Sequence, residues 1–171
     1  IVERKKILGI RFDSLTAEHV LNSIIKENPF LYKRSILIIG LGKIGFKISM
    51  ALLECGNNVE IYSRNYKKTF EKCNCMDILK PQNTLARPIL HREIESSLIN
   101  KDIIITTTNS EDIINSSNCK IINNNAKIIS VGHNEISQKA IEYFIKNTNV
   151  FFSRVDIGKS LIQYLQRLLD K

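Results

Sequence analysis

SILIIGLGKIG, residues 35–45, is the stretch of sequence that decides the fold. Its first half is the short, largely apolar run that is typical of a buried parallel strand. The glycines at 40, 42 and 45 then give the spacing G-x-G-x-x-G, and apolar residues recur at helical spacing from Ile44 to Cys55. A second strand is predicted at 59–62. A glycine turn between a strand and a helix, inside a βαβ unit, is the fingerprint of a dinucleotide-binding site.

Each glycine of this turn has a predicted role. Gly40 permits the tight turn, Gly42 lets the backbone approach the pyrophosphate, and Gly45 allows the helix to pack closely on the strand. The first helical N–H groups, at Lys43 and Ile44, and the positive end of the helix dipole then face the phosphates. We therefore expect all five residues to bind the cofactor. The alternative is a tight strand-to-helix turn that holds no ligand.

The rest of the chain alternates between the two kinds of pattern. Strands are also predicted at 88–90, 102–107, 126–131 and 150–155, and helices at 13–25, 66–71, 92–99, 136–146 and from Leu161 to Leu169. This alternation predicts an α/β fold of the Rossmann type, a doubly wound and mostly parallel sheet with helices on both faces. We expect residues 1–34 to form an N-terminal segment with a lead-in helix, and residues 35–171 to form the nucleotide-binding domain.

Composition excludes several classes of protein. The net charge of +8 is spread along all 171 residues with no nucleic-acid-binding motif, so no nucleic-acid partner is expected. The four cysteines lack the spacing of a metal site. No apolar run approaches the roughly 20 residues that span a bilayer, which predicts a cytoplasmic protein without membrane contact. Because the chain begins at Ile1 rather than Met, we expect a trimmed chain or a piece of a longer protein.

The residues after the second strand bear on the choice of cofactor. NAD-binding units usually carry Asp or Glu at this position to bind the ribose 2′-hydroxyl, but this chain carries Ser63 and Arg64. Glu60 lies three residues too early, inside the strand. Arg64, followed by Lys67 and Lys68, suits a 2′-phosphate, which favours NADP over NAD. The alternative is that these cations form a solvated basic surface.

Three later segments resemble the NAD-binding domain of S-adenosylhomocysteine hydrolase. They are DIIITTT at 102–108 with DII at 112–114, NA at 125–126, and VGHNEI at 131–136. The resemblance implies that Thr106, Thr107 and Thr108 line the cofactor cleft, and that Gly132 and His133 approach the nicotinamide and the substrate, where His133 could relay a proton. RFDS at 11–14 resembles the family's hinge segment, and Asp13 fits the aspartate there. His133 and Asp13 are therefore the predicted catalytic residues.

The sequence also departs from that family. It lacks the Phe-Asp pair after His133, and Gly9 stands where the family has its catalytic lysine. No substrate domain is recognisable in the 171 residues. The leading interpretation is an NAD(P)-binding domain of an incomplete or partner-dependent relative, in a homo-oligomer or with a substrate-domain partner. Two alternatives are a free-standing NADP-dependent oxidoreductase of unknown substrate and a non-enzymatic cofactor-sensing domain.

Overall fold

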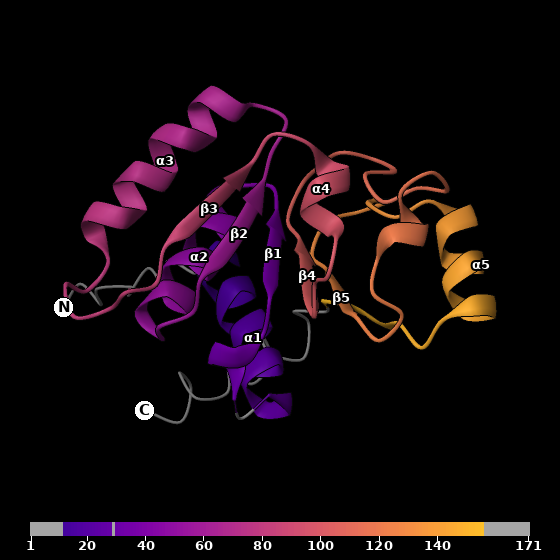
Figure 1. Cartoon of the computed structure of the whole chain (residues 1–171), viewed down its shortest axis with the longest axis horizontal. Helices are drawn as coiled ribbons and strands as arrows, with labels where there is room; N and C mark the ends of the chain where they lie inside the picture. The colour runs from indigo at the N-terminus through magenta and orange to yellow at the C-terminus, as the bar shows by residue number, and fades with distance from the viewer. Residues whose placement is uncertain (1–11, 29, 156–171) are drawn as a thin grey trace, which may run out of the picture.

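The computed structural model of the chain describes residues 12–28 and 30–155 (Figure 1). The predicted helix over Leu161 to Leu169 lies outside the described residues. The strands are β1 (Ile36–Ile39), β2 (Val59–Tyr62), β3 (Pro88–His91), β4 (Ile103–Thr106), β5 (Lys127–Ser130) and β6 (Phe151–Arg154). The α-helices are α1 (Phe12–Glu27), α2 (Lys43–Glu54), α3 (Tyr66–Leu79), α4 (Ile94–Leu98) and α5 (Gln138–Asn147), and the 3₁₀ turns are η1 (Leu31–Lys33) and η2 (Cys119–Ile121).

The described strands form one parallel sheet in the order β3-β2-β1-β4-β5-β6. The chain first winds outward from β1 to β3, returns to the middle, and winds outward again from β4 to β6. This is the doubly wound order of the Rossmann fold, with its topological switch point between β1 and β4. The predicted fold class is confirmed.

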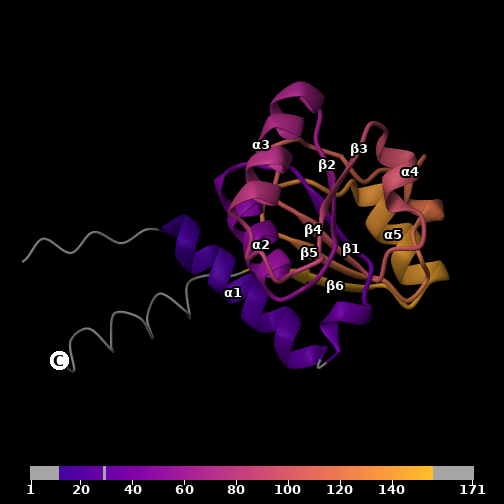
Figure 2. The same cartoon turned by 60° about the vertical axis from the view of Figure 1, so that its left-hand side comes forward.

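Helices cover both faces of the sheet (Figures 1 and 2), and the central strands β1 and β4 are buried throughout. Ile36 and Ile38 face a core shared with α1, α2 and α3, while Leu37 and Ile39 face a second core shared with α4, η2 and α5. All four side chains are at most 1% exposed. Full burial of such a side chain contributes about 1.5–3 kcal/mol, which explains why an unbroken apolar run marks the central strand.

Helix α3 is longer than the sequence predicts: the predicted helix ends at residue 71, whereas α3 continues to Leu79. Its start is capped by the Asn65 side chain, which accepts a hydrogen bond from the backbone N–H of Lys68 at 3.1 Å. Its buried face consists of Thr69, Cys73 and Met76. A threonine and a cysteine among lysines give a weak apolar pattern, so the extra turns were missed. None of the described helices has the length and apolarity to cross a bilayer.

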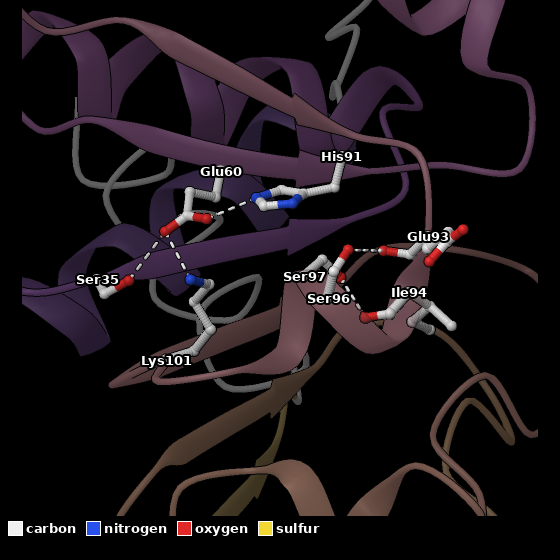
Figure 3. A network of polar contacts seen from close by, with 8 residues as sticks. All are labelled: Ser35, Glu60, His91, Glu93, Ile94, Ser96, Ser97 and Lys101. Carbon is white, nitrogen blue, oxygen red and sulfur yellow. Dashed lines mark hydrogen bonds and ion pairs between the residues drawn. The ribbon is translucent and has the colours of Figure 1, made fainter.

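A polar cluster ties β1, β2 and β3 to the segment before β4 on the face covered by α4 (Figure 3). The Glu60 carboxylate accepts hydrogen bonds from Ser35 Oγ at 3.0 Å and from Lys101 Nζ at 2.7 Å, and contacts His91 Nε2 at 2.6 Å. The side chain of Lys101 is only 8% exposed. Partial burial by itself raises the pKa of Glu60, but the hydrogen bonds from Lys101 and His91 outweigh it and hold the pKa below its ordinary value of 4.5.

We predict that Glu60→Gln lowers the free energy of unfolding by about 2–4 kcal/mol at pH 7, because it leaves the Lys101 ammonium buried without its carboxylate. A carboxylate with a lowered pKa stabilises the fold fully above about pH 5 and loses that effect as the pH falls through its folded-state pKa. The difference between wild type and variant, measured by urea unfolding, should therefore shrink in acid. Glu54→Gln, at an exposed carboxylate, is the control; equal effects of the two variants would contradict the prediction.

Candidate functional site

A cleft of about 750 Å³ opens at the carboxyl ends of β1, β2 and β4. Three segments line it: residues 39–42 after β1, residues between 62 and 72 at the end of β2 and in α3, and residues between 107 and 113 after β4. The cleft therefore spans the switch point between β1 and β4, which is where doubly wound sheets bind their ligands. Its volume is in the usual range for a small-molecule site.

At two of the three glycine positions in the turn, Gly40 and Gly45, the backbone conformation or the packing of the protein requires a glycine. Gly40 has a φ of +95°, and its N–H donates to Tyr62 O at 2.8 Å. A Cβ on Gly45 would lie 2.2 Å from Gly40 O and 2.6 Å from Thr107 Oγ1, which is closer than atoms can approach. These two positions bring the start of α2 against the ends of β1 and β4.

Gly42 is different, because a Cβ there would meet no atom of the described residues within 4 Å and its φ of −73° suits any residue. The residue is exposed, lines the cleft and is the N-cap of α2. The N–H groups of the first turn of α2 have no partner within the helix and carry its positive dipole end. The turn thus leaves open space where a dinucleotide pyrophosphate would approach, which fits such a group. Lys43 is exposed beside this space, while Ile44 packs into the core.

The three threonines at the end of β4 have separate surroundings. Thr107 lines the cleft and fastens the glycine turn, since its Oγ1 donates to Gly40 O at 2.7 Å and its N–H to Ile39 O at 2.8 Å. Thr108 also lines the cleft. Thr106 is fully buried and outside the lining, where its Oγ1 donates to Glu135 Oε2 at 2.6 Å.

The end of the cleft over β2 is basic. Ser63 and Arg64, which the sequence predicts to bind near the adenosine ribose, line this end of the cleft, and Lys68 and Lys72 line it from adjacent turns of α3. Lys72 Nζ also donates a hydrogen bond to Leu41 O. The sequence missed Lys72 because the predicted helix ended one residue before it, although the spacing of four from Lys68 would have placed both on one face.

The cleft lining within the described residues contains no acidic side chain. Glu60, the acid nearest in sequence to Arg64, is bound on the sheet face to Lys101 and His91 rather than to the cleft (Figure 3).

The two predicted catalytic residues lie outside the lining of this cleft. The Asp13 carboxylate binds Lys47 Nζ at 2.7 Å, between α1 and α2. His133 is exposed in the turn after β5, where its Nδ1 accepts a hydrogen bond from Arg154 at the end of β6. Gly132 connects this turn to the cleft wall, since a Cβ on it would lie 2.4 Å from Thr108 O.

The geometry agrees with a comparison against protein families. Residues 22–131, which include the glycine turn, β2, α3 and the threonine strand, match the family model described as shikimate/quinate 5-dehydrogenase. The chain belongs to the shikimate/quinate 5-dehydrogenase family. The predicted class of cofactor, NAD or NADP, is confirmed at the level of this family. A search of curated protein sequences found no significant match.

Solved structures show the same fold at low sequence identity. The A chain of dipicolinate synthase from Bacillus subtilis matches with a TM-score of 0.66 and 16% identity, over 92% of this chain and 53% of that one. A shikimate dehydrogenase in complex with NADP+ matches with a TM-score of 0.59 and 15% identity, over 82% and 50%. The D-isomer-specific 2-hydroxyacid dehydrogenase from Lactobacillus delbrueckii ssp. bulgaricus, in its NAD-complexed form, matches with 0.62 and 14%, over 86% and 50%. The chain spans about half the length of these proteins.

The resemblance to S-adenosylhomocysteine hydrolase is wrong, because the matching family model and these structures belong to other enzymes. The resemblance arose at positions that serve the fold. Thr107 fastens the glycine turn, Thr106 and Glu135 join the ends of β4 and β5, and Gly132 has no room for a side chain. Contacts of this kind belong to the fold rather than to one chemistry, so these residues are poor evidence for a particular activity.

The glycines give a paired prediction. Gly45→Ala should lower the free energy of unfolding by about 2–3 kcal/mol, because its methyl group would overlap backbone at Gly40. Gly42→Ala should change it by less than about 1 kcal/mol, yet weaken NADP binding about tenfold or more because the methyl group enters the phosphate space. Urea unfolding and calorimetric titration measure the two effects. Undiminished NADP binding by Gly42→Ala would contradict this role of the turn.

Proposed function

We propose that this chain is the NADP-binding domain of an oxidoreductase of the shikimate/quinate 5-dehydrogenase family. In this proposal residues 35–171 bind the cofactor and residues 1–34 lead into them. The groups that hold the substrate come from a separate domain or from another chain of an oligomer. The observation that carries the proposal is a cleft at the switch point with open backbone at Gly42, whose described lining residues at the β2 end include cations but no acid.

Charge in the cleft supports NADP rather than NAD. An NAD site presents a carboxylate to the ribose hydroxyls, and a carboxylate would repel a 2′-phosphate. Here Glu60 is held away from the cleft by Lys101 and His91. The guanidinium of Arg64 can bind phosphate oxygens through two parallel hydrogen bonds, and Lys68 and Lys72 add positive charge on the same side.

Hydride transfer between NADP and a hydroxyl or carbonyl carbon requires a group that takes up or supplies one proton. The cleft lining within the described residues has no His, Cys, Asp or Glu. We propose His133 for this proton, because its turn adjoins Thr108 through Gly132 and its imidazole is exposed. Asp13 is the weaker of the two predicted catalytic residues, since its carboxylate is already bound to Lys47.

The composition of the cleft lining also favours a second candidate function, a cofactor-sensing domain that binds NADP without oxidising or reducing a substrate. Binding alone needs no group to take up or supply a proton, and the described lining residues of the cleft include no His, Cys, Asp or Glu. The two functions differ in one measurement. With a panel of hydroxy acids and NADP+, and with the domain or chain that holds the substrate present, an oxidoreductase produces absorbance at the wavelength of reduced nicotinamide, while a sensor shows saturable binding and no such product.

Arg64→Ala tests the cofactor assignment. Loss of a charged hydrogen bond costs about 1.5–3 kcal/mol, so we expect NADP affinity to fall roughly 10- to 100-fold while NAD affinity stays within about threefold. Isothermal titration of both cofactors against wild type and variant measures this difference.

Lys67→Ala is the matched control, because Lys67 is exposed in the first turn of α3, three residues after Arg64, carries the same charge and lies outside the cleft lining. It should leave both affinities nearly unchanged. An Arg64→Ala variant that binds NADP as well as wild type, or that loses NAD affinity equally, would show that the guanidinium does not recognise a 2′-phosphate.

A further inference from the structure

Glu135 is a carboxylate buried between the ends of β4 and β5, with 1% of its surface exposed. Four donors surround it: Oε2 accepts from Thr106 Oγ1 at 2.6 Å, Ser130 Oγ at 2.7 Å and the Gly132 N–H at 2.9 Å, and Oε1 accepts from the Thr108 N–H at 2.8 Å. No Lys, Arg or His in the described part of the chain forms an ion pair with it. Since a buried carboxylate without a cation is costly, a neutral side chain would fill this space more cheaply.

The four donors belong to two strands and to the turns that follow them. Thr106 is the last residue of β4 and Ser130 the last of β5. The chain returns Glu135 toward these ends through Asn134, which has a φ of +55° that asparagine tolerates. A Cβ on Gly132 would lie 2.7 Å from Glu135 Cδ, so the turn closes tightly over the carboxylate.

This carboxylate lies behind one end of the cleft. In a doubly wound sheet the adenosine end of a dinucleotide lies over β1 to β3, and the nicotinamide end lies over the second half of the sheet. Thr108 lines the cleft at that second half, and its N–H is held by Glu135. The other held N–H, of Gly132, precedes His133.

We propose that Glu135 is a positioning residue for the nicotinamide half of the cofactor. It holds Thr108 and the turn containing Gly132 and His133 in fixed positions against each other, so that the cleft wall is formed before the nicotinamide arrives. This inference rests on the proposed function, since it requires that the cleft bind NADP. The adenosine half, bound over β2, does not depend on Glu135.

The two backbone contacts explain why a carboxylate is needed rather than an amide. One backbone N–H faces each oxygen, Thr108 on Oε1 and Gly132 on Oε2, and neither N–H can become an acceptor. A glutamine in either orientation turns its NH2 group toward one of them. The hydroxyls of Thr106 and Ser130 can rotate, but the backbone cannot, so the amide displaces either the cleft wall or the turn.

Two ligands separate the halves of the site: NADPH, and adenosine 2′,5′-bisphosphate, which has the 2′-phosphate but no nicotinamide. We expect Glu135→Gln to weaken NADPH binding about tenfold or more and to leave bisphosphate binding within about twofold of wild type. Fluorescence of the bound dihydronicotinamide should also move toward that of free NADPH. Glu60→Gln, at a partly buried carboxylate of β2 that is bound to Lys101, should change the two affinities equally or not at all.

An unchanged NADPH affinity, or equal loss of both ligands, would overturn the proposal. If Glu135→Gln does not fold, Thr106→Val replaces it, because it removes one donor and keeps the shape of the side chain. It should weaken NADPH alone, by about threefold or more, while the control Thr16→Val, at a buried threonine of α1, should weaken neither. If wild type binds no bisphosphate, the proposed function itself fails, and this inference fails with it.

Discussion

The arrangement of the whole site depends on the contact between the glycine turn and the end of β4. Thr107 Oγ1 donates to Gly40 O at 2.7 Å, and Gly45 approaches the same two residues so closely that it cannot carry a side chain. This contact joins the two halves of the sheet at their switch point and directs the first turn of α2 toward the cleft. Within the described part of the chain, atoms of the protein crowd Gly40 and Gly45, but none lies within 4 Å of a Cβ built at Gly42, so the turn is packed on one side and open on the other. An open, pre-formed backbone surface binds phosphate without first having to reorganise.

Two carboxylates with different partners, Glu60 and Glu135, belong to strands and turns next to this cleft, but neither lines it. Glu60 is neutralised by Lys101 and contacts His91 on the face covered by α4, which leaves the β2 end of the cleft to Arg64, Lys68 and Lys72. Glu135, at the other half of the sheet, has neutral donors alone among the described residues, two of which are backbone N–H groups beside the cleft wall. Glu60 therefore keeps its negative charge outside the cleft, and Glu135 holds the backbone N–H of Thr108 in the cleft wall.

Local patterns were sufficient to predict the fold. The apolar run of β1 and the spacing of its glycines follow from burial and backbone geometry, which act within a few residues, and Ser63 and Arg64 lie at the end of β2 for the same reason. Lys72 was missed because the predicted helix ended one residue before it, whereas Glu135 could not be placed from local patterns because its partners lie up to 29 residues away. The mistaken resemblance to S-adenosylhomocysteine hydrolase rested on residues at strand ends whose contacts serve the fold and carry no information about the substrate.

A crystal structure of the chain grown with NADP tests the central claim most directly, because the claim concerns where each phosphate binds. The account predicts that the pyrophosphate contacts backbone N–H groups at the start of α2, next to Gly42, and that the 2′-phosphate contacts the Arg64 guanidinium. A dinucleotide bound elsewhere on the sheet, or one whose 2′-phosphate points to solvent while its pyrophosphate avoids the glycine turn, would contradict it.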